Sequence, residues 1–114
     1  MDGTWRRTDQ IVTQPYGDGV AELVCPRCGS LGLHHAQVVV YDRAEDAPEV
    51  TITTVINSGC EVVPHSQGTE NPSSRRDGIA IRFWCEVCGQ DPIDLTLGQH
   101  EGGTQIGWRF IPDK

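Results

Sequence analysis

The sequence is poor in positive charge. Nine lysines and arginines stand against sixteen aspartates and glutamates, so the formal net charge is −7 at pH 7. Proteins that bind duplex nucleic acid over a broad surface are basic, because neutralised phosphates supply most of the affinity. The negative net charge therefore argues against a protein that binds nucleic-acid duplexes in general, and it suits a partner that is itself basic.

Long apolar runs are also missing. No stretch is long enough to cross a bilayer, and the first seven residues lack the apolar segment of a signal peptide. We therefore expect no membrane association and a cytoplasmic location. No window shows an apolar stripe with a period of 3.6 residues, which argues against a helical fold. The length of 114 residues suits one domain, and the sequence leaves the oligomeric state open.

Cysteine is the informative residue type. Four of the five cysteines form two C-x2-C turns, C-P-R-C-G from residue 25 and C-E-V-C-G from residue 85, here named the first and second cysteine turns. Each turn can present two sulfurs to one ion, and four thiolates complete a tetrahedral zinc shell. A complete shell leaves no position for a substrate, so we predict one structural Zn²⁺. The predicted ligands are Cys25, Cys28, Cys85 and Cys88.

Redox chemistry is the alternative for these thiols. A redox motif needs one C-x2-C pair followed by a helix, so two pairs without a helix favour the metal. The fifth cysteine, Cys60, is then a reactive or partner-facing thiol, or the nucleophile of a pair with His65. A catalytic pair needs hydrogen-bond reach and a third orienting group, and nothing in the sequence positions these two residues.

Alternating apolar residues predict a mostly antiparallel β fold. Residues 36–41 and 49–56 form two strands around a charged turn, which predicts a hairpin inserted between the cysteine turns. The strand 79–84 places its isoleucines and phenylalanine on one face and leads into the second cysteine turn. Residues 93–97 and 106–110 alternate around a Gly-Gly turn and predict another hairpin.

We divide the chain into an N-terminal arm, residues 1–19, and a single β domain, residues 20–114. The arm mixes polar residues with proline and glycine, and Trp5 is its only large anchor. Within the domain, residues 57–78 are polar and interrupted by glycine and proline. This composition predicts a long flexible loop.

The cysteine turns resemble those of the zinc-ribbon superfamily, whose C-P-x-C-G and C-x-x-C-G turns hold a small three-stranded sheet. The first turn matches fully, whereas Glu86 stands in the second turn where proline is common. The separation of the turns exceeds the usual ribbon spacing, which implies an inserted hairpin with a long loop. The chain also resembles small, mostly uncharacterised zinc-ribbon proteins of actinobacteria and their phages, over residues 75–85 and 99–104. The likeness to these proteins implies no assigned activity.

We predict a non-enzymatic, zinc-stabilised module that docks a protein partner. The resemblance to zinc ribbons, which are frequent in transcription and other nucleic-acid machinery, implies that the partner belongs to such machinery. The alternative is binding of single-stranded nucleic acid, because bases stack on aromatic rings while arginine counters phosphate. The residues for this face are Arg75, Arg76, Arg82 and Trp84. Trp84 is equally a candidate for the core, and Trp108 more so.

A second alternative is a metal-dependent hydrolase, because hard cations bind clustered carboxylates. The candidate residues are Asp42, Glu45, Asp46, Glu49, Asp91 and Asp94. Charged turns normally face water, so we expect no such activity.

Three histidines could also act as metal ligands. Because four cysteines are available, we instead interpret His34 and His35 as strand residues, one turned out and one packed, and His100 as a turn residue.

Overall fold

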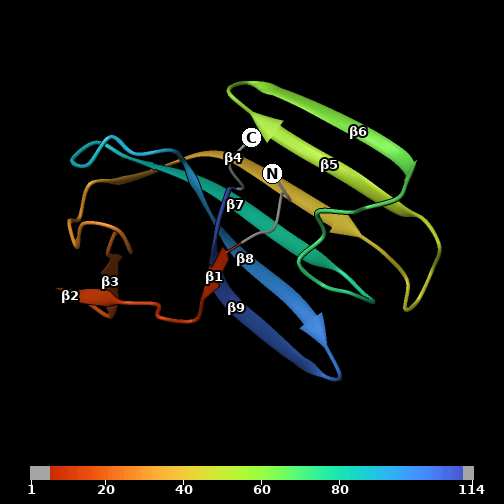
Figure 1. Ribbon diagram of the computed structural model, residues 1–114, viewed down its shortest axis with the longest axis horizontal. Helices are drawn as coiled ribbons and strands as arrows, with labels where there is room; N and C mark the ends of the chain where they lie inside the picture. The colour runs from red at the N-terminus through yellow and green to blue at the C-terminus, as the bar shows by residue number, and fades with distance from the viewer. Residues whose placement is uncertain (1–5, 112–114) are drawn as a thin grey trace.

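The computed structural model describes residues 6–111, which fold into nine β-strands and no helix (Figure 1). The predicted antiparallel β fold is confirmed. Across these residues no helix could span a membrane. The strands are β1 (Arg6–Thr8), β2 (Thr13–Gly17), β3 (Val20–Leu23), β4 (Leu33–Asp42), β5 (Val50–Ile56), β6 (Gly59–Ser66), β7 (Gly78–Cys85), β8 (Ile93–His100) and β9 (Gly103–Phe110).

Seven strands form one antiparallel sheet in the order β1-β9-β8-β7-β4-β5-β6, and β2 and β3 form a separate hairpin. At the centre β4 pairs with β7, from Leu33 opposite Cys85 to Tyr41 opposite Gly78. Strand β4 follows the first cysteine turn, and β7 leads into the second. The central pairing therefore brings both turns to the same end of the sheet (Figure 1).

One face of the sheet, the covered face, carries the main core. Its residues are Val39, Tyr41, Val50 and Ala80. The segment 67–77 lies over this face, where the Ser73 hydroxyl donates a hydrogen bond of 2.7 Å to the Gln99 carbonyl. A Cβ atom at Gly98 would lie 3.2 Å from the Pro72 backbone, so glycine permits the close approach of this segment.

The covered face also holds a buried group of charges. Asp94 and Arg109 have side chains that are each 2% exposed. Arg82 Nε donates to Asp94 Oδ1 at 2.9 Å, and Arg109 Nε donates to Asp94 Oδ2 at 3.3 Å. Arg109 Nη1 also donates to the Glu70 carbonyl at 2.6 Å, which ties the segment 67–77 to the sheet. A buried carboxylate needs such partners, because it has lost its hydration.

The opposite face is apolar and largely uncovered. Strand register aligns two rows of side chains across the six strands from β6 to β9. One row is Val62, Thr53, Val40, Ile79, Leu97 and Ile106, and the other is Cys60, Val55, Val38, Ile81, Leu95 and Trp108. All except Trp108 are at least partly exposed, with 56% at Val62 and 47% at Ile106. These two rows are called the open face.

The prediction of a flexible loop over residues 57–78 is wrong for its first part. Gly59–Ser66 form β6, which pairs with β5 through a tight turn at Asn57, whose φ is +54°. Seven of the eight residues of β6 are exposed, so both faces of the strand meet water. Its sequence therefore lacks the alternation that identifies a half-buried strand.

The expectation of an irregular N-terminal arm is also wrong for part of residues 1–19. Strand β1 pairs with β9 at one edge of the sheet, and β2 pairs with β3. The β2–β3 turn has positive φ at both Asp18 and Gly19, the geometry that a two-residue hairpin requires. The predicted anchor Trp5 lies outside the described residues.

We predict that Asp94→Asn lowers the free energy of unfolding by about 3–5 kcal/mol, because it removes the negative charge between two arginine side chains. Urea unfolding of the metal-loaded protein measures this change. Asp91→Asn makes the same substitution at an exposed position and should change the free energy by less than about 0.5 kcal/mol. Equal effects of the two substitutions would contradict the structural role of Asp94.

Candidate metal centre

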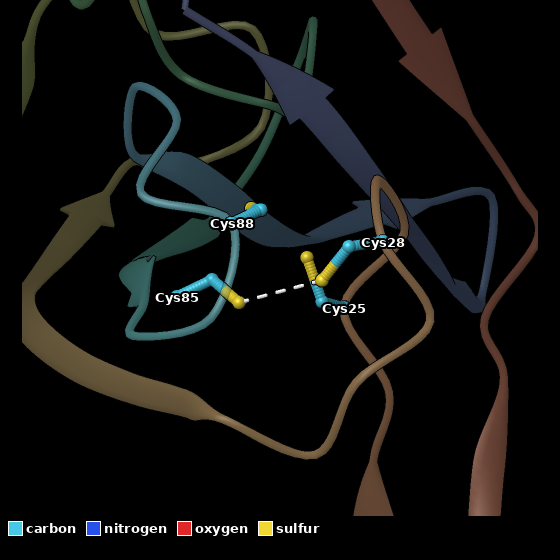
Figure 2. Close-up of side chains that lie close together, drawn as sticks. All are labelled: Cys25, Cys28, Cys85 and Cys88. Atoms are coloured by element: carbon cyan, nitrogen blue, oxygen red, sulfur yellow. Dashed lines mark hydrogen bonds between the residues drawn. The ribbon is translucent and has the colours of Figure 1, made fainter.

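The structure brings the four predicted ligands together at the end of the sheet where both cysteine turns lie (Figure 2). Their sulfur atoms all lie within 4.8 Å of one another. Cys28 Sγ and Cys85 Sγ, one from each turn, are 3.7 Å apart. Sulfurs around a tetrahedral zinc ion, at bond lengths of 2.3 Å, are separated by about 3.8 Å. The cluster therefore fits one four-coordinate metal ion.

The two cysteine turns have equivalent backbone geometry. The Gly29 amide donates to the Cys25 carbonyl at 2.9 Å, and the Gly89 amide donates to the Cys85 carbonyl at 3.2 Å. Both glycines have positive φ, +76° and +60°, a conformation that residues with a Cβ rarely adopt. The glycine after each C-x2-C pair thus closes a tight turn that points two sulfurs to the same side.

The thiols differ in their readiness to ionise. Burial raises the pKa of Cys25 to about 11. Hydrogen bonding to the Ser30 hydroxyl lowers the pKa of Cys85 to about 6 and also lowers that of Cys28. Cys85 is therefore largely a thiolate at neutral pH, whereas Cys25 must lose its proton when a metal binds.

Ser30 is a residue that the sequence analysis missed. Its hydroxyl oxygen lies 3.2 Å from Cys28 Sγ and 3.3 Å from Cys85 Sγ, so it contacts one ligand from each turn. It also accepts a hydrogen bond of 3.3 Å from the Gly32 amide. Such neighbours orient metal ligands. The only sequence signal is its position directly after the first cysteine turn.

The two turns also contact each other away from the sulfurs. The Glu86 amide donates to the Gly32 carbonyl at 3.0 Å. The Arg27 guanidinium donates to the Asp91 carbonyl. A residue inside each turn therefore bonds to a residue that follows the other turn, which links the two halves of the site.

His34 and His35 lie in β4, as predicted, but both are exposed, so the expectation that one of them is packed is wrong. His34 stacks on Trp84, with ring centroids 4.5 Å apart, and its Nε2 lies 2.8 Å from Glu86 Oε1. Neither histidine belongs to the cysteine cluster. His100 ends β8, with its Nε2 3.8 Å from Glu101 Oε2.

The arginines proposed for nucleic-acid binding lie beside carboxylates. Arg75 Nη2 lies 2.8 Å from Asp46 and 3.0 Å from Glu45, and Arg76 Nη2 lies 2.7 Å from Glu45. The fourth member of the set, Trp84, is 45% exposed and is not a core residue, whereas Trp108 is buried. The neighbouring carboxylates thus reduce the positive charge that Arg75 and Arg76 offer to a phosphate. Binding of single-stranded nucleic acid through these residues stays a prediction.

The other catalytic candidates are not assembled. Cys60 and His65 lie in one strand five residues apart, about 16 Å, beyond hydrogen-bond reach. His65 Nδ1 instead lies 2.9 Å from Glu49 Oε1. Within residues 6–111 the four cysteines are the only group of histidine, cysteine and acidic side chains found close enough to share a metal ion.

Comparison of the chain with protein-family models, with curated proteins and with solved structures finds no match. The likeness to zinc ribbons therefore rests on the cysteine turns and the strands beside them.

We predict that protein purified under reducing conditions contains one zinc ion per chain by elemental analysis. Cys28→Ser removes one ligand of the cluster and should lose this zinc on dialysis. Cys60→Ser makes the same change outside the cluster and should retain it. Full zinc occupancy in Cys28→Ser after dialysis would contradict the site.

Proposed function

We propose that the protein is a non-enzymatic module, stabilised by one Zn²⁺, that binds a protein partner through its open face. Four thiolates in a tetrahedral cluster are a ligand set that structural zinc prefers. Such a shell leaves no coordination position for a substrate. All five cysteines are free thiols, which supports the proposal of a reducing compartment, the cytoplasm.

The open face is the observation that supports partner binding. Apolar surface costs about 25 cal/mol per Å² while it stays in water. The two rows cross six strands, a width of about 24 Å at the usual strand spacing, and contain no charged residue. Monomeric proteins rarely expose contiguous apolar patches beyond a few hundred Å². A protein surface packed on these rows would remove them from water.

Within the described residues, the first cysteine turn covers the open-face side of the sheet only near Phe110, where Arg27 lies against the ring, and all side chains of the two rows except Trp108 stay at least partly exposed. The segment 67–77 packs on the other side, where Arg109 and Gln99 hold it. The hairpin of β2 and β3 lies apart from the sheet (Figure 1). The proposed role of zinc is to hold the sheet in the form that presents this face.

We predict that Val40→Lys abolishes partner binding, because it puts a charge into the middle of the open face. Tagged wild-type and variant proteins would be used to capture partners from the native host, and the proteins recovered would be quantified. Val63→Lys is the control, since Val63 is similarly exposed on the other side of β6.

Proteins held by the wild type and by Val63→Lys, but lost by Val40→Lys, are the expected partners. Binding of a purified partner should then show a negative heat-capacity change, the mark of apolar burial. Recovery of the same proteins with Val40→Lys would contradict the proposed function.

A further inference from the structure

We propose that Ser30 is a positioning residue of the metal centre, whose hydroxyl donates its one proton to Cys85 and thereby holds a ligand of the second cysteine turn. This inference rests on the zinc part of the proposed function and does not involve the open face. The hydroxyl oxygen lies 3.3 Å from Cys85 Sγ and 3.2 Å from Cys28 Sγ. Ser30 therefore contacts one predicted ligand from each cysteine turn.

Backbone hydrogen bonds on two sides fix the position of the Ser30 hydroxyl. The Cys25 amide donates to the Ser30 carbonyl at 2.9 Å, which holds this residue against the first cysteine turn. The Gly32 amide donates to the hydroxyl oxygen at 3.3 Å, and the Gly32 carbonyl accepts from the Glu86 amide at 3.0 Å. A chain of hydrogen bonds thus runs from the second turn through Gly32 to Ser30.

Gly32 lets the two turns come this close. A Cβ atom at this position would lie 2.8 Å from Glu86 Cγ and 3.0 Å from Val87 Cγ2. Both atoms belong to the second cysteine turn. The absence of a side chain at residue 32 therefore favours the close approach of this turn to Ser30.

The donors and acceptors around the hydroxyl specify where its proton goes. A serine hydroxyl has one proton and two lone pairs. The Gly32 amide and the Cys28 thiol each donate to the oxygen, at 3.3 Å and 3.2 Å. Both lone pairs are then used, and Cys85 Sγ is the remaining hydrogen-bonding neighbour, at 3.3 Å. The hydroxyl therefore donates to Cys85.

The same proton would stay with Cys85 when a metal binds. Metal-bound thiolates carry no proton and only accept hydrogen bonds. Cys28 is exposed and can accept from water, whereas Cys85 is 7% exposed and depends on groups of the protein. Hydrogen bonds to an anionic acceptor are about twice as strong as those between neutral groups. Ser30 would thus stabilise the Cys85 thiolate and orient it toward the ion.

The zinc affinity of the full chain, measured by competition with a chelator under reducing conditions, tests the proposal. We expect Ser30→Ala to raise the zinc Kd about 10–100-fold, the usual effect of losing such a neighbour. Ser30→Thr keeps a hydroxyl and should restore most of the wild-type affinity. Ser58→Ala makes the same change at an exposed position between β5 and β6 and should leave the Kd unchanged. Circular dichroism at saturating zinc checks that all variants are folded.

Cobalt substitution separates hydrogen bonding to sulfur from a merely structural role of Ser30. Co²⁺ binds thiolate sites of the same kind, and its absorption spectrum then contains sulfur-to-metal charge-transfer bands. A hydrogen bond stabilises the sulfur lone pairs from which these bands arise. The bands should therefore move to longer wavelength in Ser30→Ala and return in Ser30→Thr. A changed turn that kept the hydrogen bond would leave them in place.

Alkylation of Cys28 tests which sulfur receives the proton, because a hydrogen bond makes a thiolate a weaker nucleophile. Protein in excess zinc is treated with iodoacetamide, and mass spectrometry follows the label at Cys28. Donation to Cys85 predicts the same rate at Cys28 in Ser30→Ala as in the wild type. A rise of more than about threefold would overturn the assignment to Cys85.

Two results would overturn the role of Ser30 as a whole. One is a zinc Kd and a cobalt spectrum of Ser30→Ala that match those of Ser58→Ala. The other is a weaker zinc Kd in Ser30→Ala with unshifted cobalt bands. A wild-type chain that binds neither metal would instead contradict the zinc centre itself, and with it the proposed function.

Discussion

Four sulfur atoms at one end of the sheet hold together two segments that are far apart in the chain. The distances among them suit one tetrahedral ion, and each pair comes from a turn that glycine closes. Because β4 follows one turn and β7 precedes the other, a metal ion bound by the four cysteines would fix the register of the central strand pair. All other strands of the sheet add outward from this pair. A metal ion bound at this point would supply stability that one small core does not.

The core is small because the segment 67–77 covers only one face of the sheet, and, among the described residues, the opposite face is fully buried only at Ile93 and Trp108. The segment 67–77 approaches Val50 at Gly68 and approaches Gly98 at Pro72, and the Asp94–Arg109 ion pair lies buried on the same face. On the other face, twelve side chains from six strands form a continuous band, and all of them except Trp108 are at least partly exposed. A chain that folds around a metal can maintain such an imbalance, since it does not depend on burying both faces. The uncovered face is then available for association.

The sequence predicts the cluster of four cysteines, most of the strands and their facing residues well, because each depends on local spacing. The alternation of Ile79, Ile81 and Phe83 correctly places them on one side of β7. It does not reveal which side is covered, because the covering segment is itself polar and attaches through the hydrogen bonds of Ser73 and Arg109. Which face of the sheet is covered depends on contacts between segments that are distant in the sequence, and a local sequence pattern does not indicate such contacts.

The remaining errors have the same physical origin. Strand β6 is exposed on both sides, so its sequence resembles a loop. Asp94 suggests a solvated surface by residue type, yet cross-strand register places it beside Arg82 and buries it together with Arg109. Ser30 contacts ligands of both turns only because distant strands pair.

Hydrogen–deuterium exchange before and after chelation tests most directly whether the metal holds the sheet. The account predicts that removal of the metal under reducing conditions abolishes amide protection in β4 and β7 together, and then in the strands that depend on them. Protection of β4 and β7 that is unchanged after the metal has left would contradict it.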